Sequence, residues 1–208
     1  MLNNDLIASA NKLISFFSKF KFDAISQWKP YYHMGATITD SVLQAGLNYS
    51  NIVYPRVMNL LYEFPDYKTT CDFIILMKIF PLEKIISLKN SKKLERIKTL
   101  SWFLYENRIE NEDQLAIWLN DKSNIDRLSQ IEGIGPKTID YLKMLSGNQA
   151  VAVDRHLFRF LELAGISIRT YEEARAVYCK AAEILEISQF ELDRKVWSFM
   201  SNAKYLRV

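Results

Sequence analysis

Apolar residues recur at steps of three and four along most of the chain, a spacing that places them on one face of a helix. Residues 6–17 give the first example, with apolar side chains at Leu6, Ala10, Leu13, Ile14 and Phe17. The same spacing predicts helices over about 92–105, 170–185 and 190–200. Long runs that alternate apolar and polar residues are absent, and the most strand-like segment, 151–153, has only three residues. The pattern therefore predicts an all-α protein.

Composition agrees with a helical protein that buries a sizeable core. Hydrophobic residues make up 49% of the 208 residues, whereas glycine and proline, at 6 and 5, are too sparse for an all-β chain rich in tight turns. No apolar stretch reaches the roughly 18 residues of a membrane span. The N-terminal residues lack the features of a signal peptide. We therefore expect an intracellular protein that does not associate with membranes.

The cysteine content argues against a metal centre. Cys71 and Cys179 are far apart in the sequence, and neither belongs to a CxxC pair. Two cysteines are too few to hold an iron–sulfur cluster, and a zinc site is disfavoured for the same reason. We expect two buried thiols, no metal and no cofactor.

Positive charge is concentrated in residues 84–98, which we call the basic segment. The net charge of the whole chain is only +3. The basic segment holds Lys84, Lys89, Lys92, Lys93, Arg96 and Lys98, against one acidic residue, Glu95. Such a segment is typical of a solvated helix face, and it also suits the phosphates of a nucleic acid. The charge permits a nucleic-acid partner without requiring one.

Residues 123–145 read as two helices joined by a tight turn. Ser123-Asn124-Ile125-Asp126 has the pattern of a capping box and predicts the start of the first helix. The turn follows at 131–135, and Pro136 suits the first turn of the second helix, where a missing N–H costs nothing. Backbone N–H groups of residues 133–135 then precede a helix N-terminus, where they could bind a DNA phosphate. A plain turn between two helices is the alternative.

Two segments resemble the signatures of the helix-hairpin-helix DNA glycosylases, the superfamily that includes endonuclease III and 8-oxoguanine glycosylase. The first is Ile131-Glu132-Gly133-Ile134-Gly135-Pro136-Lys137-Thr138, and the second is Val151-Ala152-Val153-Asp154-Arg155-His156-Leu157-Phe158-Arg159. Their order and separation are close to those of the family. A weaker resemblance joins Val42-Leu43-Gln44-Ala45-Gly46-Leu47-Asn48 to the segment that carries DNA-wedging residues. The resemblance spans about 36–165 and is most specific over 131–159.

The resemblance implies an enzyme that excises a damaged or mismatched base from double-stranded DNA, acting as a monomer. Family members with lysine at the position of Lys137 also nick the abasic site: the amine attacks the sugar C1′, and the resulting Schiff base allows β-elimination. Asp154 is the implied second catalytic residue, with no metal or cofactor. The implied DNA-binding residues are Gly133, Ile134, Gly135, Thr138, Arg155, His156, Gln44, Leu47 and Asn48.

The chemistry of the pair is consistent with these roles. A lysine nucleophile must be neutral when it attacks, and partial burial near a helix N-terminus favours the neutral amine. An ionised Asp154 would instead stabilise the positive charge that develops on the sugar, with proton transfer from Lys137. Taken singly, Asp154 reads equally as a helix N-cap, and Lys137 as a solvated lysine paired with Asp140.

The expected architecture has two helical lobes around a DNA-binding cleft. Residues 36–149 would form a helical barrel lobe that ends in the helix-hairpin-helix, at about 124–146. Residues 1–35 and 150–208 would form the second lobe, which carries the catalytic aspartate. Lys137 and Asp154 would then line the cleft.

Two departures from the family leave the excised lesion open. The chain lacks the four C-terminal cysteines of endonuclease III-like members, and it has Glu132 where many relatives have proline. It is also too short for the additional N-terminal domain that usually accompanies 8-oxoguanine glycosylases. The alternatives are a glycosylase without lyase activity, for instance for alkylated bases, and a helix-hairpin-helix protein that binds DNA without chemistry. An unrelated helical interaction module is a further alternative.

Overall fold

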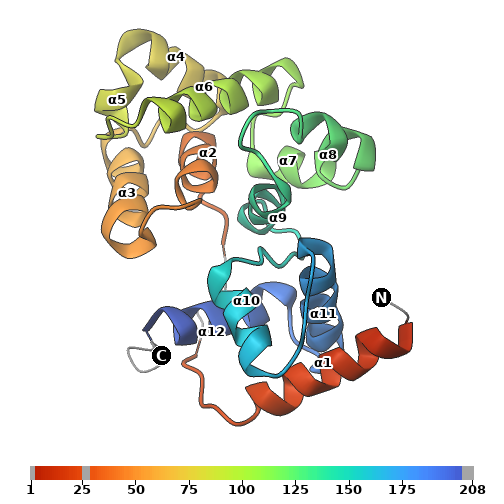
Figure 1. The fold of residues 1–208 in the computed structure, drawn as a ribbon. Coiled ribbons are helices and arrows are strands. Elements are labelled where there is room, and N and C mark those ends of the chain that lie inside the picture. Colours follow the sequence, from red (N-terminus) through yellow and green to blue (C-terminus); the bar gives the residue numbers. More distant parts are fainter. Residues whose placement is uncertain (1–2, 25–28, 203–208) are drawn as a thin grey trace. The chain divides into compact units, whose positions relative to one another are not determined.

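The computed structural model describes residues 3–24 and 29–202, and over these residues the chain contains helices and no strand (Figure 1). The predicted all-α class is therefore confirmed. Contacts divide the chain into two compact units. Residues 28–148 form one, called the middle unit here, and residues 1–27 with 149–208 form the other, called the terminal unit. Lys137 belongs to the middle unit and Asp154 to the terminal unit.

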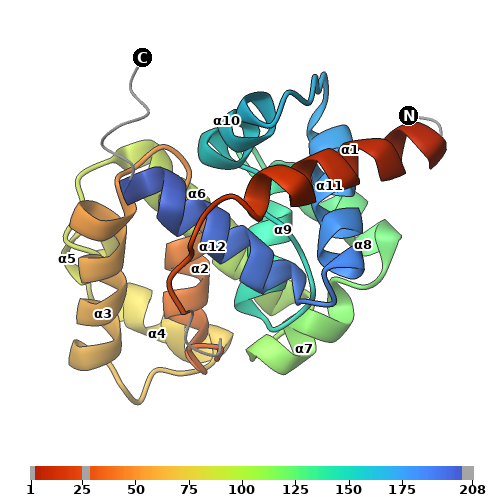
Figure 2. The same cartoon turned by 90° about the horizontal axis from the view of Figure 1, so that it is seen from below.

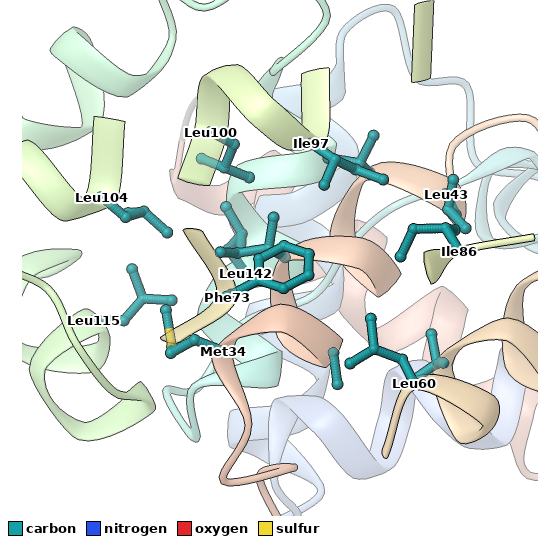
Figure 3. Close-up of a cluster of buried hydrophobic side chains, with 14 of the residues drawn as sticks. Met34, Leu43, Leu60, Phe73, Ile86, Ile97, Leu100, Leu104, Leu115 and Leu142 are labelled. Carbon is teal, nitrogen blue, oxygen red and sulfur yellow. The ribbon is translucent and has the colours of Figure 1, made fainter. Parts of the chain in front are cut away.

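The middle unit is built around helix α2. Its helices are α2 (Met34–Leu43), the π-helical turn η1 (Tyr49–Val53), α3 (Tyr54–Glu63), α4 (Thr70–Ile79), α5 (Leu82–Ile85), α6 (Ser91–Glu106), α7 (Glu112–Trp118), α8 (Lys122–Leu128) and α9 (Pro136–Leu145). Every residue of α2 is buried, because α3, α4, α6 and α9 all pack against it. Figure 3 shows the apolar side chains of this core, with Phe73 of α4 among Leu142 of α9 and Leu100 of α6.

Side chains before α2 and α4 satisfy the backbone N–H groups that each helix start leaves without a partner. Thr69 and Asp72 form a capping box at α4, with mutual side-chain to main-chain bonds of 3.0 Å. The ring of His33 caps α2, since Nδ1 accepts a hydrogen bond from the N–H of Ala36 at 3.1 Å. These caps fix where α2 and α4 begin.

The terminal unit consists of α1 (Asn3–Phe17), α10 (Arg155–Leu163), α11 (Tyr171–Ile184) and α12 (Gln189–Asn202). Helix α1 lies alongside α11, and α10 packs against α12, as both ribbon views show (Figures 1 and 2). Leu13, Phe160 and Tyr178 are completely buried between these helices. The apolar stripes predicted over 6–17 and 170–185 therefore face the core of this unit.

One local prediction was wrong. Ser123 does not cap the first helix of the predicted pair: α8 begins at Lys122, and Asp121 is its N-cap. The Asp121 carboxylate accepts hydrogen bonds from the N–H and the hydroxyl of Ser123, both at 2.8 Å. Asp121 is therefore the residue that caps the helix, and Ser123 lies within its first turn. Residues 151–153, the most strand-like segment of the sequence, form no strand and lead into α10, in agreement with the all-α prediction. Among the described residues, no helix is both long and apolar enough to cross a membrane.

Candidate functional site

The turn between α8 and α9, residues 131–135, has a conformation that depends on glycine. Gly133 has a φ of +80°, which disfavours any residue with a Cβ. Gly135 is the extended N-cap of α9, and no atom lies within 4 Å of the place where its Cβ would be. Pro136 then occupies the first turn of α9. The main chain at Gly135 is therefore open to a partner at the N-terminus of a ten-residue helix.

Arg96 of α6 holds this turn from the side. Its Nε donates a hydrogen bond to the carbonyl oxygen of Glu132 at 3.0 Å. Its guanidinium occupies the space where a Cβ on Gly133 would lie. The second contact, from Nη2 to the Glu132 carboxylate at 4.0 Å, adds little because that side chain is 95% exposed. The turn thus depends on Arg96 as well as on its own glycine.

Ile134, Lys137 and Thr138, in and after the turn, differ in how far their side chains are accessible to a ligand. Ile134 and Thr138 are buried, so neither presents an accessible side chain to a partner. Lys137 lies in the first turn of α9 and is half-buried. The second helix of the pair predicted over 123–145 is therefore present, with Lys137 in its first turn.

Lys93 is a site residue that the sequence reading did not single out. It lies on the inward face of α6 and is only 8% exposed. Its ammonium group donates hydrogen bonds to the carbonyl oxygens of Val42 at 2.7 Å and Ala45 at 2.6 Å, at the end of α2. Burial, and then the charges of Arg96 and Lys137, lower the pKa of Lys93 to about 8. The sequence does contain an indication of this burial, because Lys93 precedes the buried Ile97 by four residues and so lies on the same face of the helix.

The segment after α2 has local structural roles. Leu47 packs partly against the core of the middle unit. Asn48 is exposed and caps η1, since its Oδ1 accepts a hydrogen bond from the N–H of Asn51 at 2.8 Å. Gln44 donates from Nε2 to the Ser41 carbonyl at 3.2 Å. Asn48 is exposed, and Gln44 and Leu47 are half-buried, so all three keep some surface that a nucleic acid could reach.

Asp40 of α2 is a completely buried carboxylate surrounded by tyrosines. It accepts hydrogen bonds from the hydroxyls of Tyr31 at 2.8 Å, Tyr141 at 3.3 Å and Tyr49 at 3.5 Å. Burial, with the charge of Asp40 next, raises the pKa of Tyr31 far above its ordinary value, so this hydroxyl stays a donor. Tyr141 lies one turn after Lys137 on α9, and its bond to Asp40 fastens α9 to α2.

In the terminal unit, Asp154 is the N-cap of α10, as the sequence predicts. Its Oδ1 accepts hydrogen bonds from the N–H groups of His156 at 2.8 Å and Leu157 at 3.1 Å. Among the described residues, none donates a hydrogen bond to Oδ2. The extended segment before it is fixed by the buried Asp193, whose Oδ2 accepts from the N–H of Ala152 at 3.0 Å. One carboxylate oxygen therefore has a structural role, and the other is oriented by it.

Of the basic residues that follow Asp154, Arg155 and Arg159 are exposed to solvent, whereas His156 packs against a neighbouring side chain. Arg155 is exposed, and Arg159 forms an exposed ion pair with Glu162 at 3.0 Å. His156 is half-buried against the ring of Trp197, with ring centroids 6.3 Å apart. Arg155 is therefore the more accessible of the two residues predicted here to bind DNA.

The basic segment presents most of its charge to solvent. Lys84, Lys89, Lys92 and Lys98 are exposed, Arg96 is half-buried and Lys93 is buried. Because Arg96 contacts the turn at residues 131–135, this part of α6 brings positive charge to the N-terminal end of α9. Within the part of the chain that the structure describes, no three His, Cys, Asp or Glu side chains gather into a group that could hold a metal ion.

These features define an all-helical protein of two compact units, with a glycine turn before a lysine-bearing helix in one and an aspartate-capped helix in the other. The sequence model described as Domain of unknown function (DUF8548) matches residues 84–201, more than half of the chain, and the chain belongs to this family. The matched segment contains Lys93, Lys137 and Asp154. Comparisons with curated proteins and with solved structures find no match for the chain.

Proposed function

We propose that the protein is a DNA glycosylase that removes a damaged or mismatched base from duplex DNA and then nicks the abasic site through a Schiff base on Lys137. The observation that carries the proposal is the placement of Lys137, half-buried at the start of α9 and directly after a glycine turn with an open main chain. An anionic phosphate suits the N–H groups at such a helix start. A bound phosphate would bring the DNA backbone beside the lysine.

The basic segment supports a DNA partner on electrostatic grounds. Four of its lysines are exposed, and Arg96 joins it to the glycine turn. Contacts of lysine and arginine with phosphates release condensed counterions, so binding should weaken steeply as salt concentration rises. The same contacts hold the duplex in place without reading its sequence, which leaves recognition of the lesion to other residues.

In the proposed reaction, the target nucleotide leaves the base stack, because C1′ is shielded within the duplex. The neutral amine of Lys137 attacks C1′, and the base departs with the electrons of the glycosidic bond. Asp154 stabilises the positive charge that develops on the sugar, using the carboxylate oxygen that does not cap α10. The attacking nitrogen loses a proton, the C1′–O4′ bond breaks and O4′ takes up a proton, which leaves a protonated Schiff base between Lys137 and C1′. The Schiff base makes the C2′ proton acidic, and loss of that proton expels the 3′ phosphate.

Borohydride trapping on duplex DNA with an abasic site tests this proposal. Wild type should form a covalent adduct that Lys137→Gln does not form. Lys122→Gln is the matched control, because Lys122 is an exposed lysine at the far end of α8 and should be trapped like wild type. A panel of lesion-containing duplexes would then identify the released base.

The alternatives give other outcomes in the same experiment. Base release without an adduct would indicate a glycosylase that uses water instead of Lys137. Salt-dependent DNA binding with neither base release nor adduct would indicate a binding protein without chemistry. The absence of DNA binding would contradict all three and favour a helical interaction module.

A further inference from the structure

A cavity of about 220 Å³ lies in the terminal unit, between α12 and the segment that follows α1. Residues 21–24 line it on one side, and Arg194, Lys195, Ser198 and Phe199 of α12 line it on the other. All of these residues belong to the same compact unit. The cavity is smaller than the roughly 300–1,000 Å³ of sites for drug-sized ligands, so it suits a small ligand or one chemical group of a larger one.

Aromatic rings hold the two sides of the cavity together. The ring of Phe199 contacts those of Phe20 and Phe22, with ring centroids 4.7 Å and 5.4 Å apart. Phe22 also stacks on Phe17 of α1, with centroids 4.1 Å apart. The chain after α1 therefore runs along α12 (Figure 2). Lys21, between the two anchored rings, is exposed and lines the cavity.

Positive charge predominates in the lining of this cavity. Lys21, Arg194 and Lys195 are cationic, and Asp23 is the one carboxylate among the lining residues that the structure describes. Lys195 already has a partner, since its ammonium group lies 2.6 Å from the carboxylate of Glu191. Lys21 and Arg194 form no ion pair with any described residue. The lining therefore keeps a net positive charge after its internal pair is counted.

Several hydrogen-bond donors around the cavity have no protein acceptor. The guanidinium of Arg194 donates to no described residue, and its Cζ lies 5.2 Å from the ring centroid of Trp197, a contact that favours one orientation. The hydroxyl of Ser198 likewise donates to no described residue. Lys195 uses one of its three donors on Glu191. Oxygens of a phosphate group accept such bonds, and arginine and lysine are its usual protein ligands.

We propose that this cavity is a phosphate-binding site, in which Lys21, Arg194 and Lys195 contact the phosphate oxygens. The hydroxyl of Ser198 donates a further hydrogen bond. The two phenylalanine rings of the lining supply an apolar wall for the group that carries the phosphate. That phosphate belongs either to a small phosphorylated molecule or to the backbone of DNA. The inference does not depend on Lys137 or on base excision.

Titration with inorganic phosphate, followed by NMR at constant ionic strength, tests the site. In wild type, the Nε–H resonance of Arg194 and the amide resonance of Ser198 should shift in a saturable way, whereas chloride should not shift them. Arg194→Gln and Lys21→Gln should each weaken phosphate binding about three- to tenfold, because each loses a charge-assisted contact. Lys12→Gln is the matched control, since Lys12 is an exposed lysine of α1 outside this cavity and should bind as wild type does.

Asp23→Asn separates the electrostatic effect from a loss of structure. Without the carboxylate, repulsion of the anion decreases, and phosphate binding should tighten about twofold. A distorted cavity would instead bind phosphate more weakly, and that result would overturn the site. The site would also be overturned by the absence of saturable shifts in wild type. Equal phosphate binding by wild type, Arg194→Gln and Lys21→Gln would place the phosphate elsewhere and so overturn it too.

Duplex DNA distinguishes the two sources of the phosphate. If the site takes a backbone phosphate, Lys21→Gln should lower the affinity for duplex DNA by about the same factor as the affinity for inorganic phosphate. If the site takes a small phosphorylated molecule, the affinity for duplex DNA should equal that of wild type. Either result supports the phosphate site. Failure of the proposed function would appear separately, as the absence of a borohydride adduct with wild type, and it would leave the phosphate titration unchanged.

Discussion

The Nε of Arg96 donates a hydrogen bond to the carbonyl oxygen of Glu132 at 3.0 Å, and this contact joins α6 to the turn that precedes α9. It also fills the space beside Gly133, whose φ of +80° already disfavours a side chain. The turn therefore depends on two separate requirements, a left-handed backbone at Gly133 and an unobstructed Arg96. A methyl group added at Gly133 tests both requirements together, and one added at another glycine with positive φ tests the backbone requirement alone.

Gly133→Ala should destabilise the protein and loosen the turn. The alanine must adopt a strained φ, which costs more than about 1 kcal/mol where the native conformation is incompatible. Its Cβ must also displace the guanidinium of Arg96 from Glu132. Gly46→Ala is the matched control, since Gly46 has a φ of +84° but no atom within 4 Å of the added Cβ. Urea denaturation should show a larger loss of stability for Gly133→Ala, and equal losses would mean that the Arg96 contact contributes nothing.

Gly135→Ala should change DNA binding and leave the fold unaffected. Gly135 has a φ of −102°, which alanine adopts without strain, and its Cβ would meet no atom within 4 Å. If a phosphate approaches the main chain here, the methyl group obstructs it, and affinity for duplex DNA should fall about tenfold, or roughly 1.4 kcal/mol. Fluorescence anisotropy with labelled duplex measures the affinity, and thermal unfolding provides the control for the fold. Unchanged affinity with an unchanged melting temperature would remove Gly135 from the proposed interface.

Asp154 has a structural and a proposed catalytic role, and two substitutions separate them. Asparagine caps helices as well as aspartate does, so Asp154→Asn should keep wild-type stability. It lacks the negative charge, however, and should lose most base release and adduct formation. Asp154→Ala should lose both the activity and about 1 kcal/mol of stability, because the N–H groups of His156 and Leu157 lose their acceptor. Full activity in Asp154→Asn would show that the residue is only a cap.

The sequence was sufficient for features that depend on local rules. The apolar spacing over 6–17 and 170–185 predicted helices whose stripes face the core, and Asp154 was expected to open a helix. Local rules gave a wrong helix start where two nearby residues could both serve as the N-cap. At the start of α8, Asp121 and Ser123 both offer a capping oxygen, and the aspartate takes the cap while the serine hydroxyl donates to it. A four-residue motif could not reveal that competition.

Lys93 shows a second limit of the sequence. It belongs to the basic segment, where a lysine is usually solvated, although its spacing of four residues from Ile97 also places it on the buried face of α6. Its role depends on the carbonyl oxygens of Val42 and Ala45, about 50 residues earlier in the chain. No local pattern encodes that contact, because it arises when α2 packs against α6. The tyrosines around Asp40 were missed for the same reason, since Tyr141 and Asp40 meet only when α9 packs on α2.

Stability of the middle unit should fall as pH decreases, through His33. The ring is neutral in the folded protein, since Nδ1 accepts from the N–H of Ala36 while Nε2 bonds to the carbonyl of Phe64 at 3.0 Å. Burial lowers the pKa of His33 below its ordinary 6.5. Below pH 6.5 the unfolded chain therefore binds a proton that the folded protein does not. The contribution of His33 is fully present above that pH and declines as pH falls toward the folded pKa, by up to about 1.4 kcal/mol per pH unit.

His33→Asn isolates this contribution, because asparagine can still cap α2 but does not titrate. Carboxylates also affect acid stability, so the informative quantity is the difference in stability between wild type and variant at each pH. Between about pH 7 and about pH 5, wild type should lose more stability than His33→Asn. His156→Gln is the control, since His156 is the other of the two histidines and lies in the terminal unit. Hydrogen exchange at the amide of Ala36 reports on α2 directly, and its protection should fall with pH in wild type and in His156→Gln. Parallel pH profiles for wild type and His33→Asn would show that the cap of α2 does not depend on a neutral imidazole.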